Sequence, residues 1–150
     1  MFNFSAEQIV FQEVPGEVSL AFTITGCQLG CKGCHSVDSW PAHSGTELTE
    51  SYLKQRLQQY KGLISCVLFL GGEWQPTKLI SLLKLVRQHQ LHTCLYTGLD
   101  KIPNLVSEQL TYLKTGPWRP ELGGLNSPIT NQRFIDLRNG ECLNHRFIKQ

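Results

Sequence analysis

The sequence predicts a single α/β domain over residues 1–150, and two observations carry this prediction. Ile64 to Leu70 is a nearly continuous apolar run of strand length, which is typical of a parallel strand covered on both faces. A helical pattern over Thr77–His89 follows it, and His92–Thr97 reads as a second apolar strand. Strand, helix and strand in this order indicate parallel strands joined by crossover helices.

Two extended stretches and a helix are predicted before this unit. Ile9 to Val14 and Glu17 to Thr25 flank a turn, and the alternation of apolar and polar residues in the second stretch favours a strand. Thr49 has the position of an N-cap for a helix over Glu50–Tyr60. Gly62 follows where a left-handed C-terminal cap is common.

The chain after residue 98 is predicted to be less regular. Pro103 limits Leu99–Glu108 to short helical turns, and Leu110–Leu113 is predicted to be a strand. Thr115–Gln132 is rich in Gly and Pro and is predicted to be a long loop. Asn139-Gly140 favours a type I′ β-hairpin. The strands of this hairpin are predicted over Arg133–Leu137 and Glu141–Phe147.

Charge and hydropathy argue against two classes of partner. The net charge is +2, and the charged residues (17%) are scattered without the basic stripe that a nucleic-acid-binding protein needs. No apolar run approaches the roughly 20 residues of a membrane-spanning helix, and Met1–Ser5 has no basic region followed by a long apolar core, so we expect no leader peptide. We therefore expect no nucleic-acid or membrane partner and a cytoplasmic location, where thiols stay reduced and free to bind metal.

Three closely spaced cysteines form the motif on which the prediction of function depends. Cys27, Cys31 and Cys34 are separated by three and then two residues and follow directly on a predicted strand. Thiolates are soft ligands that hold iron–sulfur clusters or zinc. Three cysteines rather than four would leave one iron of a 4Fe-4S cluster open to an outside ligand. A structural zinc site with His35 or His43 as the fourth ligand is the alternative.

A second motif follows the buried strand, where the apolar run continues into Gly71-Gly72-Glu73. The cysteine spacing and this motif, in this order, resemble those of the radical S-adenosylmethionine (SAM) superfamily. Within it, the stretch from Leu113-Lys114-Thr115-Gly116 to Thr130-Asn131-Gln132-Arg133 resembles the activating proteins of anaerobic ribonucleoside-triphosphate reductase. The resemblance extends from about Val18 to the end of the chain.

The resemblance implies a partial, open β/α barrel of the radical SAM type with a C-terminal β-hairpin. It also implies that the three cysteines of the motif hold a catalytic 4Fe-4S cluster and that SAM binds the open iron through its amino and carboxylate groups. Gly71 and Gly72 would let the backbone approach the methionine part of SAM. Glu73 would accept a hydrogen bond from its ammonium group.

Further SAM contacts are expected beside the last cysteine and at the next strand. Gly33 and His35 flank that cysteine, where members of the superfamily hold the adenine. The sequence departs from common patterns in Lys32-Gly33, where many members place an aromatic residue, and in Trp74, where the activators often have proline. Thr97 ends a strand on the same side of the sheet, and we expect it to touch the ribose or the carboxylate of SAM.

The other three cysteines are not expected to bind metal. Cys66 and Cys94 fall inside apolar strands, where free cysteine packs as a small hydrophobic residue. Cys142 lies in the predicted hairpin and has no thiol neighbour in the sequence. An additional cluster built from these three residues is therefore not predicted.

The resemblance implies an enzyme that cleaves SAM reductively and generates a glycyl radical on anaerobic ribonucleoside-triphosphate reductase. A flavodoxin or a similar low-potential protein is implied as the electron donor. Three alternatives remain. They are a radical SAM enzyme with another glycyl-radical enzyme or a small molecule as substrate, a non-catalytic iron–sulfur electron carrier, and a structural zinc module.

Overall fold

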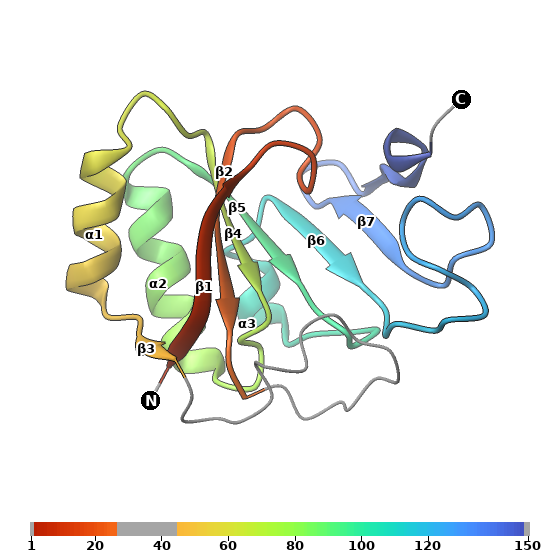
Figure 1. Ribbon diagram of the computed structural model, residues 1–150, viewed down its shortest axis with the longest axis horizontal. Helices are drawn as coiled ribbons and strands as arrows, with labels where there is room; N and C mark the ends of the chain where they lie inside the picture. The colour runs from red at the N-terminus through yellow and green to blue at the C-terminus, as the bar shows by residue number, and fades with distance from the viewer. Residues whose placement is uncertain (1, 27–44, 149–150) are drawn as a thin grey trace.

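The computed structural model of the protein describes residues 2–26 and 45–148. Their strands form one eight-stranded sheet in the order β3-β1-β2-β4-β5-β6-β7-β8 (Figure 1). The strands are β1 (Asn3–Val10), β2 (Ser19–Ile24), β3 (Thr46–Glu47), β4 (Cys66–Leu70), β5 (His92–Tyr96), β6 (Tyr112–Thr115), β7 (Arg133–Asp136) and β8 (Glu141–Cys142). The edge strands β3 and β8 do not pair with each other within the described residues, so the sheet is open.

The centre of the sheet is parallel, as the sequence predicts. β2, β4, β5 and β6 pair in parallel, and their arrows point the same way in Figure 1. Parallel neighbours need long crossover connections. These contain the helices α1 (Glu50–Gln59), α2 (Pro76–Gln88) and the short α3 (Asn104–Ser107). The remaining strands extend the sheet on both sides by antiparallel pairing.

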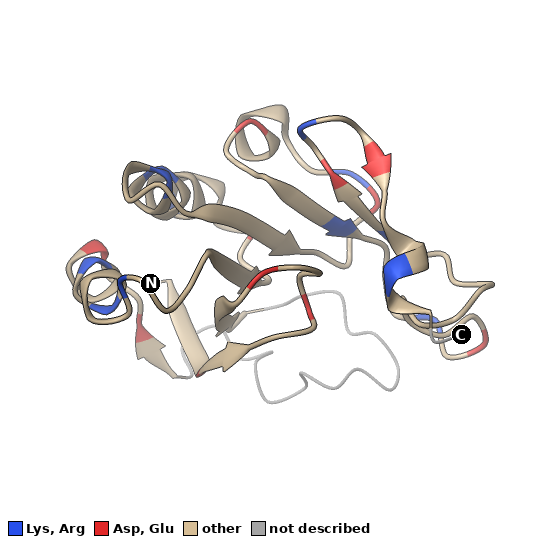
Figure 2. Cartoon of the chain, turned by 90° about the horizontal axis from the view of Figure 1, so that it is seen from above, with Lys and Arg blue, Asp and Glu red and all other residues tan. Residues whose placement is uncertain are grey.

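Both faces of the central strands are buried, which explains the continuous apolar run in the sequence of β4. Val67 and Phe69 point into a helix-side core, where they pack with apolar side chains of the three helices. Leu68 and Cys94 belong to a loop-side core on the opposite face. This second core is covered by the β1–β2 connection, by the loop over residues 116–132 and by the 3₁₀ helix Asn144–Phe147. Figure 2 shows the helices on one face of the sheet.

The two long helices begin and pack as predicted. The side chain of Thr49 caps α1, because its Oγ1 accepts a hydrogen bond from the backbone N of Tyr52 at 3.0 Å. Gly62 has φ 84° just after this helix, in the left-handed region that glycine favours. α2 starts at Pro76, which is well tolerated in the first turn. Its buried residues are the predicted ones: Leu79, Leu82, Leu83 and Val86.

The first strand lies earlier in the chain than predicted. The prediction placed it at Ile9–Val14, whereas β1 ends at Val10 and Val14 is a buried residue of the following connection. The register of β1 against β2 shifts between Phe4 and Ala6, as in a β-bulge. A bulge turns the following side chains to the opposite face, and it therefore breaks the alternation from which a strand is recognised in a sequence.

Two corrections concern the C-terminal part. β6 covers Tyr112–Thr115 rather than Leu110–Leu113. The hairpin is present, but its turn is not the predicted type I′, because that turn needs positive φ at both central residues. Only Gly140 has positive φ (75°), and its backbone N donates to Asp136 O at 2.8 Å across a four-residue loop over 137–140. β8 is also short, since the 3₁₀ helix replaces most of the predicted second strand.

Charged side chains pair between neighbouring elements. Arg56 Nε of α1 is 3.0 Å from Glu7 Oε2 of β1, and Arg138 Nη2 is 2.8 Å from Asp136 Oδ2 in the terminal hairpin. Charges of both signs are spread over the helices and the hairpin in Figure 2. None of the described helices is long and apolar enough to cross a membrane.

A polar cluster around the buried Glu17 and Tyr112 joins the β1–β2 connection to the amino ends of the parallel strands. Oε2 of Glu17 accepts a hydrogen bond from the Tyr112 hydroxyl at 2.8 Å and lies 2.5 Å from His92 Nδ1. The Tyr112 hydroxyl in turn accepts from Arg138 Nη2 at 3.2 Å. Burial raises the pKa of Tyr112 most, and the hydrogen bond to Glu17 raises it further. The phenol therefore stays protonated and donates its proton to Glu17. The cluster therefore fixes the terminal hairpin to the centre of the sheet.

Tyr112→Phe is expected to lower the free energy of unfolding by about 1–3 kcal/mol, because it leaves a buried carboxylate oxygen with one partner fewer. Urea denaturation followed by circular dichroism measures this loss. Tyr60→Phe is the matched control, since no hydrogen bond of the Tyr60 hydroxyl is found within the described residues. Equal free energies of unfolding for the two variants would show that the hydrogen bond from Tyr112 to Glu17 contributes little to stability.

Candidate functional site

The predicted SAM-binding residues that the structure describes lie at one edge of the sheet. The carboxyl ends of β2, β4, β5 and β6 meet there, at the bottom of Figure 1, and we call this the carboxyl edge. Leu70 pairs with Tyr96, so β4 and β5 end at the same level. Gly71-Gly72-Glu73 follows the first of these strands and Thr97 follows the second. Parallel α/β sheets bind their ligands at this edge.

The chain also reaches the cysteine motif at the carboxyl edge. Thr25, directly after β2, is 1% exposed. Its backbone N and its hydroxyl both donate to Asn3 O, at 2.9 and 3.3 Å. Gly26 is buried and has φ 98°. Outside the described residues lie the motif itself and its neighbours: Cys27, Cys31, Gly33, Cys34 and His35. Their predicted roles stay predictions.

The two glycines of the second motif have a local structural reason. Gly71 and Gly72 have φ 97° and 110°, conformations that other residues rarely adopt. A Cβ on Gly71 would lie 2.7 Å from Cη2 of Trp74, and one on Gly72 would lie 2.8 Å from Cζ of Phe2. Side chains at these positions would therefore clash with the packing around the turn, whether or not a ligand is bound.

Glu73 is a buried carboxylate with one oxygen paired and one oxygen unpaired. It is 8% exposed. Oε1 accepts a hydrogen bond from Thr97 Oγ1 at 2.7 Å. Oε2 is buried and has no hydrogen-bond partner within the described residues. Buried polar atoms in proteins are normally paired, so an unpaired carboxylate oxygen at a ligand-binding edge indicates a site for a hydrogen-bond donor.

The surroundings of Glu73 act on its charge in opposite directions. Burial raises the pKa of Glu73, because the charged form loses its hydration. The hydrogen bond from Thr97, the interaction with the backbone N–H of Glu73 itself and the positive charge of Lys114 lower it. Burial is the largest of these effects, so the ionised carboxylate is held at a cost that a bound cation would offset.

Comparison with protein-family models decides the family. Residues 14–114, which are more than half of the chain, match the model described as a 4Fe-4S single cluster domain. The chain belongs to the 4Fe-4S single cluster domain family. The matched region contains β2, β4, β5 and all but the last residue of β6, and therefore also Glu73, Thr97 and Lys114 of the carboxyl edge.

A curated protein is also similar to this member of the 4Fe-4S family. The pyruvate formate-lyase-activating enzyme of Clostridium pasteurianum is 35% identical over 100 residues. The similarity covers 63% of this chain and 42% of the relative, so the chain spans less than half of the length of that protein.

The three cysteines outside the motif differ in their burial. Cys66 and Cys94 are fully buried in the central strands, and Cys142 is exposed in the hairpin. Burial raises the pKa of Cys66 to about 12 and raises that of Cys94 as well, so neither thiol is disposed to ionise as a metal ligand. No group of three or more potential metal ligands occurs among the residues with described positions. The prediction that Cys66 and Cys94 are core residues is confirmed.

Lys114 is a residue of the carboxyl edge that the sequence analysis did not identify as functional. It lies in β6, with Nζ 5.6 Å from the centre of the Tyr96 ring and 3.3 Å from Gly116 O. Lys114 stands in the stretch Leu113-Lys114-Thr115-Gly116 that resembles the reductase activators, but the resemblance assigned no role to it. Only the pairing of β6 with β5 brings its charge close enough to act on Glu73.

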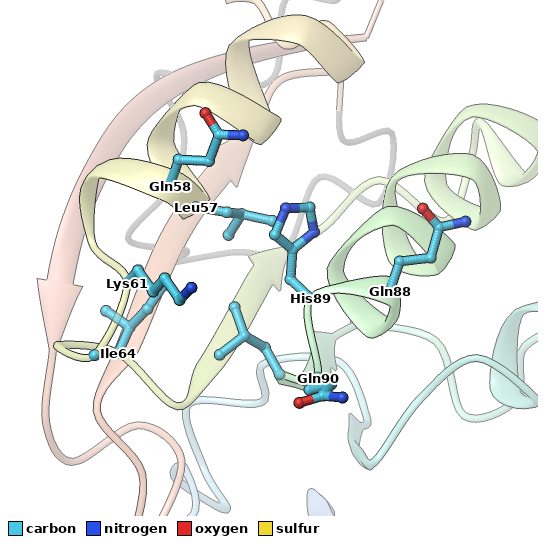
Figure 3. Close-up of a pocket in the computed structure, with 9 residues that line it drawn as sticks. Leu57, Gln58, Lys61, Ile64, Gln88, His89 and Gln90 are labelled. Atoms are coloured by element: carbon cyan, nitrogen blue, oxygen red, sulfur yellow. The ribbon is translucent and has the colours of Figure 1, made fainter.

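A cavity of about 450 Å³ lies away from the carboxyl edge, between the C-terminal ends of α1 and α2 (Figure 3). Leu57, Lys61 and His89 line it together with residues that lead into β4 and β5. It is therefore close to the amino ends of these strands. His89 Nδ1 lies 3.0 Å from Leu85 O, so one ring nitrogen is used within α2 itself. This cavity contains none of the predicted site residues.

Glu73→Gln is expected to stabilise the ligand-free protein at neutral pH by on the order of 1 kcal/mol. The raised pKa of Glu73 means that the folded state binds more protons than the unfolded state, so the stability of the wild type falls as the pH rises above the ordinary glutamate value. Glu73→Gln has no ionisable carboxyl group at this position, so its stability does not fall in this way as the pH rises. Its advantage should shrink as the pH falls towards about 4.3.

Urea denaturation between pH 8 and pH 4.5 measures this difference. Glu121→Gln is the control, because Glu121 is exposed in the 116–132 loop and should change stability by less than about 0.5 kcal/mol. A Glu73→Gln variant that is less stable than the wild type at neutral pH would contradict the prediction.

Proposed function

We propose that this protein is a radical SAM activating enzyme, which cleaves SAM reductively and generates a glycyl radical on a partner enzyme. The observation that carries the proposal is the buried Glu73 carboxylate with its unpaired oxygen at the carboxyl edge. Membership of the 4Fe-4S single cluster domain family and similarity to a glycyl-radical activating enzyme support it.

Cys27, Cys31 and Cys34 are proposed to hold the 4Fe-4S cluster. The other cysteines are poor candidates, since two are buried with raised pKa values and the third is distant in sequence from any thiol. When bound, the cluster and SAM together supply the electron and the radical chemistry. The role of Gly33 and His35 beside the adenine of SAM is likewise proposed from the resemblance alone.

The described residues would bind and orient the methionine part of SAM. Glu73 Oε2 would accept a hydrogen bond from the ammonium group, which fits an acceptor that is buried and unpaired. Gly71 and Gly72 would present backbone rather than side chains to the ligand. The open sheet, parallel at its centre, supports the proposal of a partial barrel of the radical SAM type, with the ligand at the carboxyl ends of the strands.

The proposed partner is anaerobic ribonucleoside-triphosphate reductase, with a flavodoxin-like electron donor. The resemblance to the activators of that reductase rests partly on residues 113–133, most of which lie beyond the region that the family model matches. Pyruvate formate-lyase is the second candidate partner, because the curated relative is named as its activating enzyme.

Anaerobic reconstitution tests the proposal. Iron-loaded protein is mixed with SAM, dithionite and either candidate partner, and electron paramagnetic resonance detects a glycyl radical. A radical on the reductase alone supports the first partner, and a radical on pyruvate formate-lyase alone supports the second. A brown protein whose cluster spectrum does not respond to SAM would indicate an electron carrier instead.

Cys27→Ala, Cys31→Ala and Cys34→Ala are each expected to abolish cluster-dependent SAM cleavage, because each removes one of three iron ligands. Cys66→Ala is the control and should retain cleavage, with some loss of stability from its buried position. Iron content and the yield of methionine measure the outcome. Loss of the cluster in Cys66→Ala together with its retention in Cys31→Ala would refute the ligand assignment.

The loop over residues 116–132 is proposed to help bind the partner segment that carries the glycine. It starts directly after β6 at the carboxyl edge and is internally hydrogen-bonded, for example from Thr130 Oγ1 to Gly123 O at 2.9 Å. Leu125 anchors it in the loop-side core, whereas Ile129 is 65% exposed. Trp118 is half-buried beside Gly124 and is therefore less suited than Ile129 to a direct contact with the partner.

Ile129→Ser is expected to weaken activation of the partner by about fivefold, since burial of an apolar side chain of this size contributes about 1 kcal/mol or more. SAM cleavage without the partner should persist. Leu63→Ser is the matched control, because Leu63 is 68% exposed but lies between α1 and β4, at the other end of the sheet. If the two variants activate the partner equally at limiting protein concentration, the 116–132 loop does not bind the partner and only connects β6 to β7.

A further inference from the structure

We propose that Thr97 is a positioning residue, which holds the Glu73 carboxylate in the orientation that receives the ammonium group of the ligand. The inference rests on the proposed function. It replaces the expectation that Thr97 touches the ribose or the carboxylate of SAM.

The hydroxyl of Thr97 makes two hydrogen bonds within the protein, one as acceptor and one as donor. The backbone N of Leu99 donates to Thr97 Oγ1 at 3.1 Å, so the hydroxyl proton must point elsewhere. Oγ1 donates it to Glu73 Oε1 at 2.7 Å. A threonine hydroxyl has one proton to donate, and this one is used. Thr97 is also only 2% exposed, which leaves little surface for a ligand.

The support behind Thr97 is itself fixed. The backbone N of Thr97 donates to Lys114 O at 2.9 Å, which ties the end of β5 to β6. Leu99 O accepts from the backbone N of Gly116 at 2.8 Å. The hydroxyl is therefore held by two neighbouring segments, and it presents its proton to Glu73 from a defined direction.

A comparison with Glu17 shows what this arrangement leaves open. Glu17 and Glu73 are equally buried, each 8% exposed. Glu17 Oε2 has two partners, Tyr112 and His92, and forms a closed structural cluster. Glu73 Oε1 is held by Thr97, while Oε2 has no partner within the described residues. Thr97 thus fixes one oxygen of Glu73 and leaves the other to accept a hydrogen bond from one N–H of the amino group of the ligand.

The charges around Glu73 make the effect of Thr97 measurable by pH. Burial raises the pKa of Glu73, and the hydrogen bond from Thr97 and the charge of Lys114 oppose that effect. Removing the hydroxyl should therefore raise the pKa of Glu73 further. Because the ammonium group binds the ionised carboxylate, the loss of SAM affinity on acidification should begin at a higher pH.

Thr97→Val and Thr97→Ser provide the test, since valine keeps the shape without the hydroxyl and serine keeps the hydroxyl. Calorimetry with SAM and anaerobically reconstituted protein measures the affinity between pH 6 and pH 9. Thr97→Val is expected to bind SAM about tenfold more weakly, as the loss of a hydrogen bond to a charged group implies. Its affinity should also decline at a higher pH, whereas Thr97→Ser should stay within about threefold of the wild type.

A second measurement does not depend on SAM. Carboxyl ¹³C NMR titration of the ligand-free protein should give a higher pKa for Glu73 in Thr97→Val than in the wild type and Thr97→Ser. Equal values in all three proteins would overturn the inference, as would equal impairment of both variants. If Glu73→Gln and the wild type both fail to bind SAM, the proposed function is wrong, and the NMR titration still decides whether Thr97 positions the carboxylate.

Discussion

The parallel pairing of β4 with β5 is the interaction on which the rest of the structure depends. Its register sets Leu70 opposite Tyr96, so the two strands end together and the turns that follow them lie side by side. Glu73 and Thr97 are 24 residues apart in the chain and meet only because of this register. Because of the same pairing, both faces of the two strands are buried. One face packs against the helices and the other against the loops.

The two ends of the parallel strands show different uses of a buried glutamate. At the amino ends, Glu17 is paired with Tyr112 and His92, and the resulting cluster fixes the terminal hairpin. At the carboxyl edge, Glu73 keeps one oxygen unpaired at a cost to stability. The two buried glutamates therefore differ: Oε2 of Glu17 has two partners in a structural cluster, whereas Oε2 of Glu73 is open to the hydrogen-bond donor of the proposed ligand.

The family match ends at residue 114, in β6. Glu73, Thr97 and most of the helix-side core therefore belong to the part shared with other 4Fe-4S single cluster domains. Outside the match lie β1 at one end and β7, β8 and the 116–132 loop at the other, and these C-terminal elements cover much of the loop-side core. This division supports the proposal that the matched part carries the cluster and the SAM site, whereas the C-terminal part contributes to the choice of partner.

The sequence by itself determined the central strands and both long helices, because double-sided burial and helical periodicity are local patterns that capping residues such as Thr49 delimit. The sequence also predicted Glu73 as a site residue, because Gly71-Gly72-Glu73 after a buried strand, together with the cysteine spacing, resembles the motifs of the radical SAM superfamily. The tertiary structure alone decided the bounds of β1, where a shift in register breaks the alternation of side chains. It also decided the turn of the hairpin, where Asp136 O accepts a hydrogen bond from the backbone N of Gly140. Only the tertiary structure showed that Thr97 donates a hydrogen bond to Glu73 and that the charge of Lys114 acts on Glu73. The reason is that pairing between strands distant in the chain depends on the packing of the whole sheet and not on local composition.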